Sequence, residues 1–288
     1  MQNILFSDSV GGISVERIER DFNFNMLSKH FHNEYEIYYL VNGERYYFIE
    51  KQIYYVKKGS LVFIDRNQIH KTVGANTNYH DRVLMLISEE ELKPILSLCD
   101  SFDAATFFTK NFGIIELSEA GQKHVECILF AIIREMKQKQ SNYEFLIKAK
   151  LAELMIYAQR CKNGENSTVK AEPVKTEKYK KISEIAQYIN ENYQTDISLS
   201  DISRDFYISK CYLSRIFKEI TGFTVNEYIN IIRVKKAQQL LEHSEYNITE
   251  IADLIGYDSI TYFEKIFKKY LELSPLKYRK KFAKKAKA

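Results

Sequence analysis

Three side chains near the N-terminus have the types and spacing of a metal-binding or ligand-binding set. His30 and His32 flank one residue, and Glu36 follows them within the stretch KHFHNEYEIYYLVNG. If this stretch is a strand, residues 30, 32 and 36 share parity and point to one face. Tyr38 continues that face. Such a set could hold a metal ion and support catalysis, or it could line a pocket that senses a small molecule.

The surrounding sequence predicts short strands that would position these side chains. The runs EYEIYYLVNG, ERYYFIEKQIYYV, GSLVFIDRNQIHKTV and HDRVLMLIS are rich in Tyr, Ile, Phe and Val and are separated by turn signals. The pair Asn42-Gly43 between the first two runs is a hairpin signal. Many short strands at regular spacing favour a small barrel or sandwich over residues 1–116.

From about residue 117 the apolar period becomes that of a helix. A second helix is expected at about 142–161, so that residues 117–161 form an antiparallel helical hairpin. This hairpin could cap the barrel, and we expect it to form a dimer contact as well. The stripe of the first helix is Leu117, Val125, Ile128, Leu129, Ile132, Ile133 and Met136.

Composition separates a nearly neutral first part from a basic second part. Residues 162–178, KNGENSTVKAEPVKTEK, hold hardly any large apolar side chain and are predicted to be a linker. Residues 175–288 hold 21 Lys and Arg against 15 Asp and Glu, a net charge of +6, whereas the whole chain carries +4. A basic C-terminal third that ends in KYRKKFAKKAKA suggests a polyanionic partner.

Several classes of protein are disfavoured by the same sequence. The first residues, MQNILFSDSVGG, lack the pattern of a signal peptide, and no apolar run approaches the length of a membrane span. We therefore expect a cytoplasmic protein that makes no membrane contact. Cys99, Cys127, Cys161 and Cys211 are widely spaced, which indicates unpaired thiols and not a disulfide framework or a zinc site.

The C-terminal region, residues 179–288, repeats itself. YLSRIFK at 212–218 aligns with YFEKIFK at 262–268, an offset of 50, and the short helices predicted before them align at an offset of 49. Helix, tight turn and helix, present twice among seven predicted helices, indicate two helix-turn-helix units. The helix expected between them at about 225–242 would be roughly 27 Å long, which suits adjacent major grooves about 34 Å apart.

The second helix of each unit should lie in the major groove of DNA. Its apolar stripe is expected to be buried, which leaves a polar and basic face outside. Arg215 is the best candidate for a bidentate contact to guanine. The residues predicted to face DNA are Ser209, Lys210, Cys211, Ser214, Arg215 and Lys218 in the first unit and Ser259, Ile260, Thr261, Glu264, Lys265 and Lys268 in the second.

Residues 248–280 read ITEIADLIGYDSITYFEKIFKKYLELSPLKYRK, and the connecting helix carries the pattern R-x-x-x-A-x-x-LL. With these motifs, residues 180–285 resemble the DNA-binding domain of the AraC/XylS family of bacterial transcription regulators. One departure is Glu272, which stands where the family usually has glycine, so we expect a locally altered turn. Gly222 holds that place in the first unit. The matching residues are Ile251, Ala252, Gly256, Phe263, Phe267, Lys268, Pro275 and Arg279, with Arg233, Ala237, Leu240 and Leu241 in the connecting helix.

The N-terminal half is similar, more loosely, to cupins. The spacing of His30, His32, Glu36 and Gly43 matches the first cupin motif, and Gly59 with His70 matches the second. In metal-dependent cupins these three histidines and the glutamate ligate one ion, and such a set suits Fe, Mn, Ni or Zn. The second motif is degraded here, because Asp65, Asn67 and Gly74 replace its usual proline, glycine and asparagine.

These patterns predict an α+β multidomain protein, with a cupin-like barrel and helical hairpin followed by an all-α tandem helix-turn-helix domain. The predicted function is transcription regulation, controlled by a small-molecule effector such as a sugar. His30, His32, Glu36, Tyr38 and His70 would contact this effector. The expected partners are double-stranded DNA, the effector, a second copy of the chain and RNA polymerase, with no cofactor.

Two other functions stay open at this point. One is a metal-dependent cupin enzyme with an accessory helical domain, in which His30, His32, Glu36 and His70 would hold the ion. The other is a non-specific nucleic-acid binder, which the distinct exposed residues of the two recognition helices disfavour.

Overall fold

The chain folds into two compact units, Met1–Lys175 and Thr176–Ala288. The boundary between these units falls inside the segment predicted as a linker. None of the helices in the described ranges is both long enough and apolar enough to cross a membrane. The computed structural model describes residues 1–22, 24, 32–97, 107–108, 113–162, 168–170, 174 and 176–283.

The first unit is built on antiparallel strands that share one long strand, β3. The first half of β3 pairs with β7 and β5 in a sheet of order β1-β2-β7-β3-β5-β8-β9, and its second half pairs with β4 and β6. β3 thus joins two sheets into the predicted barrel-like domain. The strands are β1 (Gln2–Val10), β2 (Ile13–Asp21), β3 (Tyr35–Ile49), β4 (Gln52–Lys57), β5 (Ser60–Ile64), β6 (His70–Gly74), β7 (Tyr79–Ile87), β8 (Gly113–Leu117) and β9 (Thr168–Lys170).

The hairpin predicted at Asn42-Gly43 is wrong, because β3 continues through this pair. The chain reverses instead at Glu50, where Ile49 pairs with Gln52 across a two-residue turn and Glu50 has φ +55°. Glycine is needed at position 43 for a different reason. Its φ is +98°, and a Cβ there would lie 2.3 Å from a backbone carbonyl oxygen of β7. The pair lies where β3 shifts register against β7 and passes from one sheet to the other.

Other element boundaries also differ from the sequence-based expectation. The run GSLVFIDRNQIHKTV forms two strands, because Asp65 N–H donates to Gln68 Oε1 at 3.1 Å and closes a turn between β5 and β6. Leu117 ends β8 and does not begin a helix. Residues 168–170 of the predicted linker pair with β8 as β9. The β1–β2 hairpin was not assigned from the sequence.

Alternation along β3 sends its side chains into two different cores. Tyr35, Ile37 and Tyr39 pack with the helices on the outer face of the larger sheet. Tyr38 and Leu40 pack with β4, β5 and the second half of β3. The face that carries Tyr38 is therefore the interior between the two sheets, in agreement with the parity argument.

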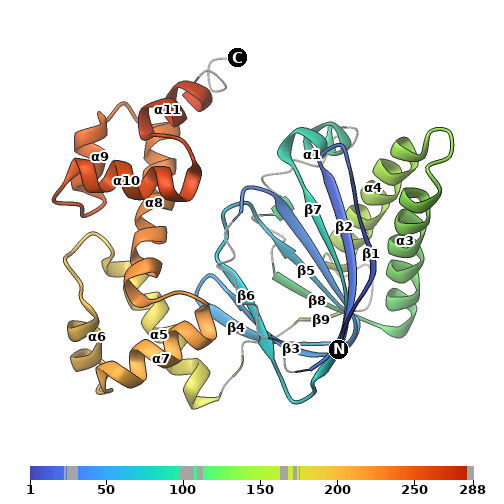
Figure 1. Cartoon of the computed structure of the whole chain (residues 1–288), viewed down its shortest axis with the longest axis horizontal. Coiled ribbons are helices and arrows are strands. Elements are labelled where there is room, and N and C mark those ends of the chain that lie inside the picture. The colour runs from blue at the N-terminus through green and yellow to red at the C-terminus, as the bar shows by residue number, and fades with distance from the viewer. Residues whose placement is uncertain are drawn as a thin grey trace. The chain divides into compact units, whose positions relative to one another are not determined.

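Within the described residues, α1 (Glu89–Leu96), α3 (Glu119–Gln138) and α4 (Tyr143–Lys162) pack on the outer face of the larger sheet. α3 and α4 lie side by side as the predicted helical hairpin (Figure 1). Ser118 caps α3 by accepting the N–H of Gly121 at 3.3 Å. The hairpin thus covers the sheet with its apolar side.

The second unit contains the seven predicted helices within residues 176–283. α8 runs between the pairs α6–α7 and α9–α10 (Figure 1). The turn from α6 to α7 is one residue shorter than the turn from α9 to α10, which explains the two offsets of the repeat. The helices are α5 (Glu177–Asn192), α6 (Leu199–Asp205), α7 (Lys210–Thr221), α8 (Val225–His243), α9 (Ile248–Leu254), α10 (Ile260–Leu271) and α11 (Pro275–Ala283).

Arg233 of α8 ties the two halves of this unit together. Its Nε donates to the carbonyl oxygen of Tyr193 at 2.8 Å, and its Nη2 donates to that of Thr195 at 3.0 Å, both just after α5. Its guanidinium carbon lies 5.1 Å from the ring centroid of Tyr257, which follows α9. The Tyr257 hydroxyl donates to Asn230 of α8 at 2.7 Å. One arginine of α8 therefore contacts both the segment that follows α5 and the second helix-turn-helix unit.

The altered turn expected at Glu272 is not found. Glu272 ends α10 with φ +59°, and its N–H donates to the carbonyl oxygen of Lys268 at 2.9 Å. Gly222 ends α7 in the same way, with φ +87° and an N–H bond to Lys218 O at 3.0 Å. Both helices end in a left-handed cap, although only one has glycine there.

Candidate effector site and DNA interface

His32, Glu36 and His70 converge in the interior between the two sheets. The Nε2 atom of each histidine lies 3.2 Å from Glu36 Oε2, and the three ligand atoms lie within 4.8 Å of one another. β6 pairs with the end of β3 so that His70 stands opposite Ile49, which brings it across to Glu36. Glu36 and His70 are buried, and His32 is half-buried. His30 lies outside the described residues.

Backbone carbonyls orient both imidazole rings. His32 Nδ1 lies 3.1 Å from the carbonyl oxygen of Glu34, and His70 Nδ1 lies 2.8 Å from that of Gln68. A carbonyl oxygen only accepts hydrogen bonds, so each Nδ1 carries a proton and donates. Each Nε2 then faces Glu36 with a lone pair, unless it gains a second proton or a cation lies between.

The electrostatics of the site favour an ionised Glu36. Burial alone would raise the pKa of Glu36, but the charges and hydrogen bonds of His70 and His32 hold it well below its usual range. Burial opposes protonation of His32, yet the hydrogen bond and charge of Glu36 raise its pKa overall. The Tyr47 hydroxyl donates to Glu36 Oε1 at 2.6 Å, and burial together with this carboxylate raises the pKa of Tyr47. Tyr47 therefore stays a neutral donor.

This arrangement can do two kinds of chemistry. Two imidazole nitrogens and a carboxylate oxygen form a donor set for a divalent transition-metal ion, and the two Nδ1 contacts are the outer hydrogen bonds that such ligands need. Without a metal, the same groups form a buried polar wall that can hydrogen-bond a small molecule. Tyr38 extends this wall, since its ring packs edge-to-face on Tyr47 with centroids 5.3 Å apart.

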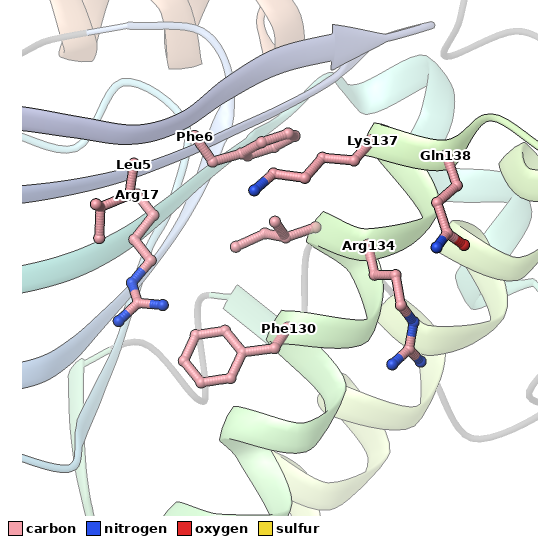
Figure 2. A pocket seen from close by; sticks show the side chains of 8 residues that line it. Leu5, Phe6, Arg17, Phe130, Arg134, Lys137 and Gln138 are labelled. Atoms are coloured by element: carbon pink, nitrogen blue, oxygen red, sulfur yellow. The ribbon is translucent and has the colours of Figure 1, made fainter.

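A separate pocket of about 340 Å³ lies on the outer face of the sheet, between β1, β2 and α3 (Figure 2). Two of its three cationic side chains lie near its aromatic rings: Arg17 Cζ is 4.7 Å from the Phe130 centroid, and Lys137 Nζ is 5.5 Å from the Phe6 centroid. The predicted effector residues that the structure describes, Glu36, Tyr38 and His70 on their strands and His32 beside them, face the other side of the sheet. The lining residues are Leu5, Phe6, Arg17, Phe130, Ile133, Arg134, Lys137 and Gln138.

The first recognition helix, α7, has the predicted two-sided character. Its apolar stripe is buried, and its opposite face is exposed. Ser214 is half-buried at the margin between them. The Cζ of Arg215 lies 5.7 Å from the ring centroid of Tyr212, the neighbouring exposed aromatic residue. The buried residues are Leu213, Ile216, Phe217 and Ile220, and the exposed predicted residues are Ser209, Lys210, Cys211, Arg215 and Lys218.

The second recognition helix, α10, matches α7 with one difference. Tyr270, predicted to be buried, is only half-buried. The other stripe residues, Phe263, Ile266 and Phe267, are buried as predicted. The predicted DNA-facing residues Ser259, Ile260, Thr261, Glu264, Lys265 and Lys268 are all exposed.

Two features of these helices were not assigned from the sequence. Ser209 and Ser259 are N-caps whose Oγ atoms accept the N–H groups of Tyr212 and Tyr262, each at 3.3 Å. Their hydroxyl hydrogens stay available to a phosphate. Tyr212 and Tyr262 occupy equivalent positions of the repeat and are 40% and 48% exposed. The offset of 50 could have revealed this pair.

Cys127, Cys161 and Cys211 form no disulfide with one another in the described part of the chain, in agreement with the sequence-based expectation. Cys99 lies outside the described residues. Cys161 is buried, and Cys211 is exposed on α7.

Two family models match the chain over most of its length. The AraC-like ligand binding domain matches residues 12–155, which is half of the chain, and a helix-turn-helix domain matches residues 202–281. The first match includes β2 to β8 and most of the helical hairpin. The second runs from within α6 to within α11.

Curated relatives match about a third of the chain. The Msm operon regulatory protein of Streptococcus mutans is 33% identical over 99 residues, which cover 34% of this chain and 36% of that protein. The transcriptional regulatory protein HptR of Staphylococcus aureus is 36% identical over 99 residues, which cover 34% and 39%. The chain thus spans little more than a third of the length of these relatives.

Solved structures of similar proteins include a domain and a longer chain. The C-terminal domain of AraT, a response regulator from Geobacillus stearothermophilus, is 33% identical, with a TM-score of 0.36 over 37% of this chain and 88% of that one. ToxT from Vibrio cholerae O395 is 15% identical, with a TM-score of 0.39 over 94% and 98% of the two chains.

Proposed function

The chain belongs to the AraC family of transcription regulators, and we propose that an effector bound inside its first unit controls how its second unit grips specific DNA. One observation carries this proposal. α7 and α10 repeat the same capped, two-sided helix at an offset of 50, and both present a polar and basic face. α8 lies between them.

The exposed faces of α7 and α10 supply the DNA contacts. Arg215 reads a base edge with its two-pronged guanidinium, and Lys218 and Lys268 bind phosphate nearer the ends of the helices. α8, at 19 residues, is about 28 Å long. Adjacent major grooves lie about 34 Å apart, so the two helices can enter successive grooves and cover about 20 base pairs.

The effector binds between the two sheets of the first unit, against His32, Glu36, Tyr38 and His70, with His30 from the neighbouring segment. Buried hydrogen-bonding groups next to two tyrosine rings suit a small hydroxylated molecule such as a sugar. Binding changes the domain orientation or dimer geometry and so favours one mode of DNA binding.

The α3–α4 hairpin joins two copies of the chain into a dimer. Phe145 and Leu146 at the start of α4 are 70% and 43% exposed, which leaves apolar surface for a second copy. Effector binding in the dimer then alters recruitment of RNA polymerase. The protein acts without catalysis.

One specific observation favours a second function, metal-dependent catalysis. It is the convergence of His32, Glu36 and His70 with both outer nitrogens held by carbonyls. We rank this function below effector sensing, because the matching family models are a ligand binding domain and a helix-turn-helix domain.

The proposal is tested by selecting DNA from a random pool with the full chain and footprinting the selected sites. We expect a defined consensus with two contacted segments one helical turn apart on each half-site. Uniform affinity for all sequences with a steep salt dependence would make the protein a non-specific binder. A thermal-shift screen of sugars and related metabolites tests the effector, because a ligand of the folded state raises the melting temperature.

A further inference from the structure

A second polar cluster lies in the interior of the first unit, beyond the histidine–glutamate set. We call it the arginine cluster: Arg20 on β2, Arg45 on β3 and Arg82 on β7, with His80 on β7. Arg20 stands opposite His80 in the β2–β7 pairing, and its Nη1 lies 3.4 Å from His80 Nε2. Two of the arginines lie near the ring of Phe24, with Arg20 Cζ 3.9 Å and Arg45 Cζ 5.8 Å from the ring centroid.

Arg20, Arg45 and His80 are buried, Arg82 is half-buried, and the cluster carries more positive charge than its contacts balance. Arg20 and Arg45 are 6% and 1% exposed. Arg82 pairs with Glu16 at 2.5 Å. In the described part of the chain, Arg20 and Arg45 form no hydrogen bond or ion pair with a carboxylate. They donate to neutral oxygens instead, Arg20 to Gln2 Oε1 at 3.0 Å and Arg45 to a backbone carbonyl at 2.5 Å. Three guanidinium groups therefore share one carboxylate.

Three buried polar atoms of this region have no hydrogen-bond partner among the described residues. They are the hydroxyl of Tyr38, which is 3% exposed, Nη1 of Arg82 and Nδ1 of His80. Burial and the repulsion of Arg82 and Arg45 lower the pKa of Arg20 to about 10. Buried unpaired donors and uncompensated charge both cost free energy, unless a ligand satisfies them.

We propose that the arginine cluster binds the anionic group, a carboxylate or a phosphate, of the effector. The planar guanidinium fork suits both oxyanions. A phosphate with a charge of −2 would balance the excess charge of the cluster, and a carboxylate with a charge of −1 would halve it. Either oxyanion could accept hydrogen bonds from Arg82 Nη1 and the Tyr38 hydroxyl. This inference rests on the proposed effector site and narrows its ligand to an acidic small molecule, such as a sugar acid or a sugar phosphate.

Tyr38 connects the two polar clusters. Its ring packs on Tyr47, whose hydroxyl donates to Glu36. It stands two residues from Leu40, which pairs with Arg82 of β7. An effector held by its acidic group at the arginines would thus extend its hydroxyls past Tyr38 towards Glu36.

The test uses simple anions, so that the natural effector need not be known. Inorganic phosphate, malonate and chloride are titrated into the full chain at constant ionic strength, and the melting temperature is followed. We expect saturable stabilisation by phosphate or malonate beyond that of chloride. The larger of the two melting-temperature increases, in malonate or in phosphate, shows whether the cluster prefers a carboxylate or a phosphate. Equal melting temperatures in all three anions would overturn the inference.

Variants separate binding from a structural role. Arg45→Gln should weaken anion binding by about 10-fold or more, since it removes a charged donor. Arg45→Met should not lower the melting temperature in chloride, because it relieves buried repulsion, whereas a purely structural arginine would cost stability. Arg17→Gln is the matched control, since Arg17 pairs with Asp81 and packs on Phe130, and it should keep the anion response. An Arg45→Gln protein with undiminished anion binding would contradict the proposal.

DNA affinity, measured in the same samples, separates this inference from the proposed function. Matched sugars, glucose, glucuronate and glucose 6-phosphate, are added in parallel. Stabilisation by anions with no change in affinity for the selected DNA would leave the anion site standing and refute effector control. If glucose stabilises the protein and changes its DNA affinity, and if Arg45→Gln leaves both responses unchanged, effector control would stand. The proposal that the effector is acidic would then be overturned.

Discussion

Glu272 and Gly222 adopt the same left-handed backbone at the ends of the two recognition helices. Their φ angles are +59° and +87°, and each N–H donates to the carbonyl oxygen four residues earlier. The family resemblance suggested that a glutamate here would change the turn. Instead, the rest of the second unit imposes the turn, and the glutamate bears its conformational cost.

Glu272→Gly should therefore stabilise the protein by about 1 kcal/mol, because glycine adopts a positive φ without steric cost. Urea unfolding followed by circular dichroism measures the difference. Gly222→Ala serves as the reciprocal control and should destabilise by a similar amount. A destabilised Glu272→Gly protein would show that the contacts of the glutamate side chain stabilise the fold by more than its positive φ destabilises it.

Gly256→Ala should destabilise the second unit much more strongly, by about 2–4 kcal/mol. Gly256 has φ +84°, and a Cβ there would lie 2.4 Å from the carbonyl oxygen of Gln194. The matched control is Gly113→Ala, because Gly113 also has a positive φ, +114°, but a Cβ there would meet no described residue within 4 Å. Similar losses in the two variants, measured by urea unfolding, would refute the role of the close approach.

The pH dependence of stability should carry the signature of His80. Burial and the charges of Arg45, Arg20 and Arg82 lower the pKa of His80 from 6.5 to about 3. The unfolded chain therefore binds a proton at this residue between about pH 6.5 and 3, where the folded chain does not. The contribution of neutral His80 is fully present above pH 6.5 and is lost as the pH falls towards 3.

Replacement of His80 by Gln should flatten this part of the stability profile, measured as urea midpoint against pH. His243, which is exposed on α8, provides the control, and His243→Gln should leave the slope between pH 6.5 and 4 unchanged. A wild-type slope that survives in His80→Gln would assign the proton uptake to other groups.

Metal removal should leave DNA binding and its response to effector unchanged. We expect purified protein to contain far less than one transition-metal ion per chain, and EDTA to have no effect on affinity for the selected DNA. His32→Ala should then lose response to the effector without loss of a metal. Near-stoichiometric iron or manganese that disappears in His32→Ala, together with turnover of a substrate, would support the enzyme instead.

Much of the arrangement follows from the sequence because regular elements obey fixed periods. Parity along one strand places Glu36 and Tyr38 on the same inner face, and the structure brings His70 to them. The repeat at an offset of 50 predicts α7 and α10 with their buried and exposed faces, because an amphipathic helix needs only local sequence.

The parts that were missed depend on pairing between distant segments. Asn42-Gly43 has the local signal of a hairpin, but β3 continues through this pair. Its first half pairs with β7 in one sheet, and its second half pairs with β4 and β6 in the other. The arginine cluster was missed for a related reason. His80 and Arg82 lie on a strand with both faces covered, so alternation cannot tell which face holds the polar interior.

The base-reading role of Arg215 tests the central claim most directly. Arg215→Ala and Arg204→Ala are compared, since Arg204 is an exposed arginine of α6 that pairs with Asp201 and Asp205. Fluorescence anisotropy gives their affinities for the selected DNA site and for random DNA. We predict that Arg215→Ala loses about 1–3 kcal/mol on the selected site alone, while Arg204→Ala keeps the ratio of the two affinities. An equal loss on both DNAs for Arg215→Ala would contradict sequence reading by α7.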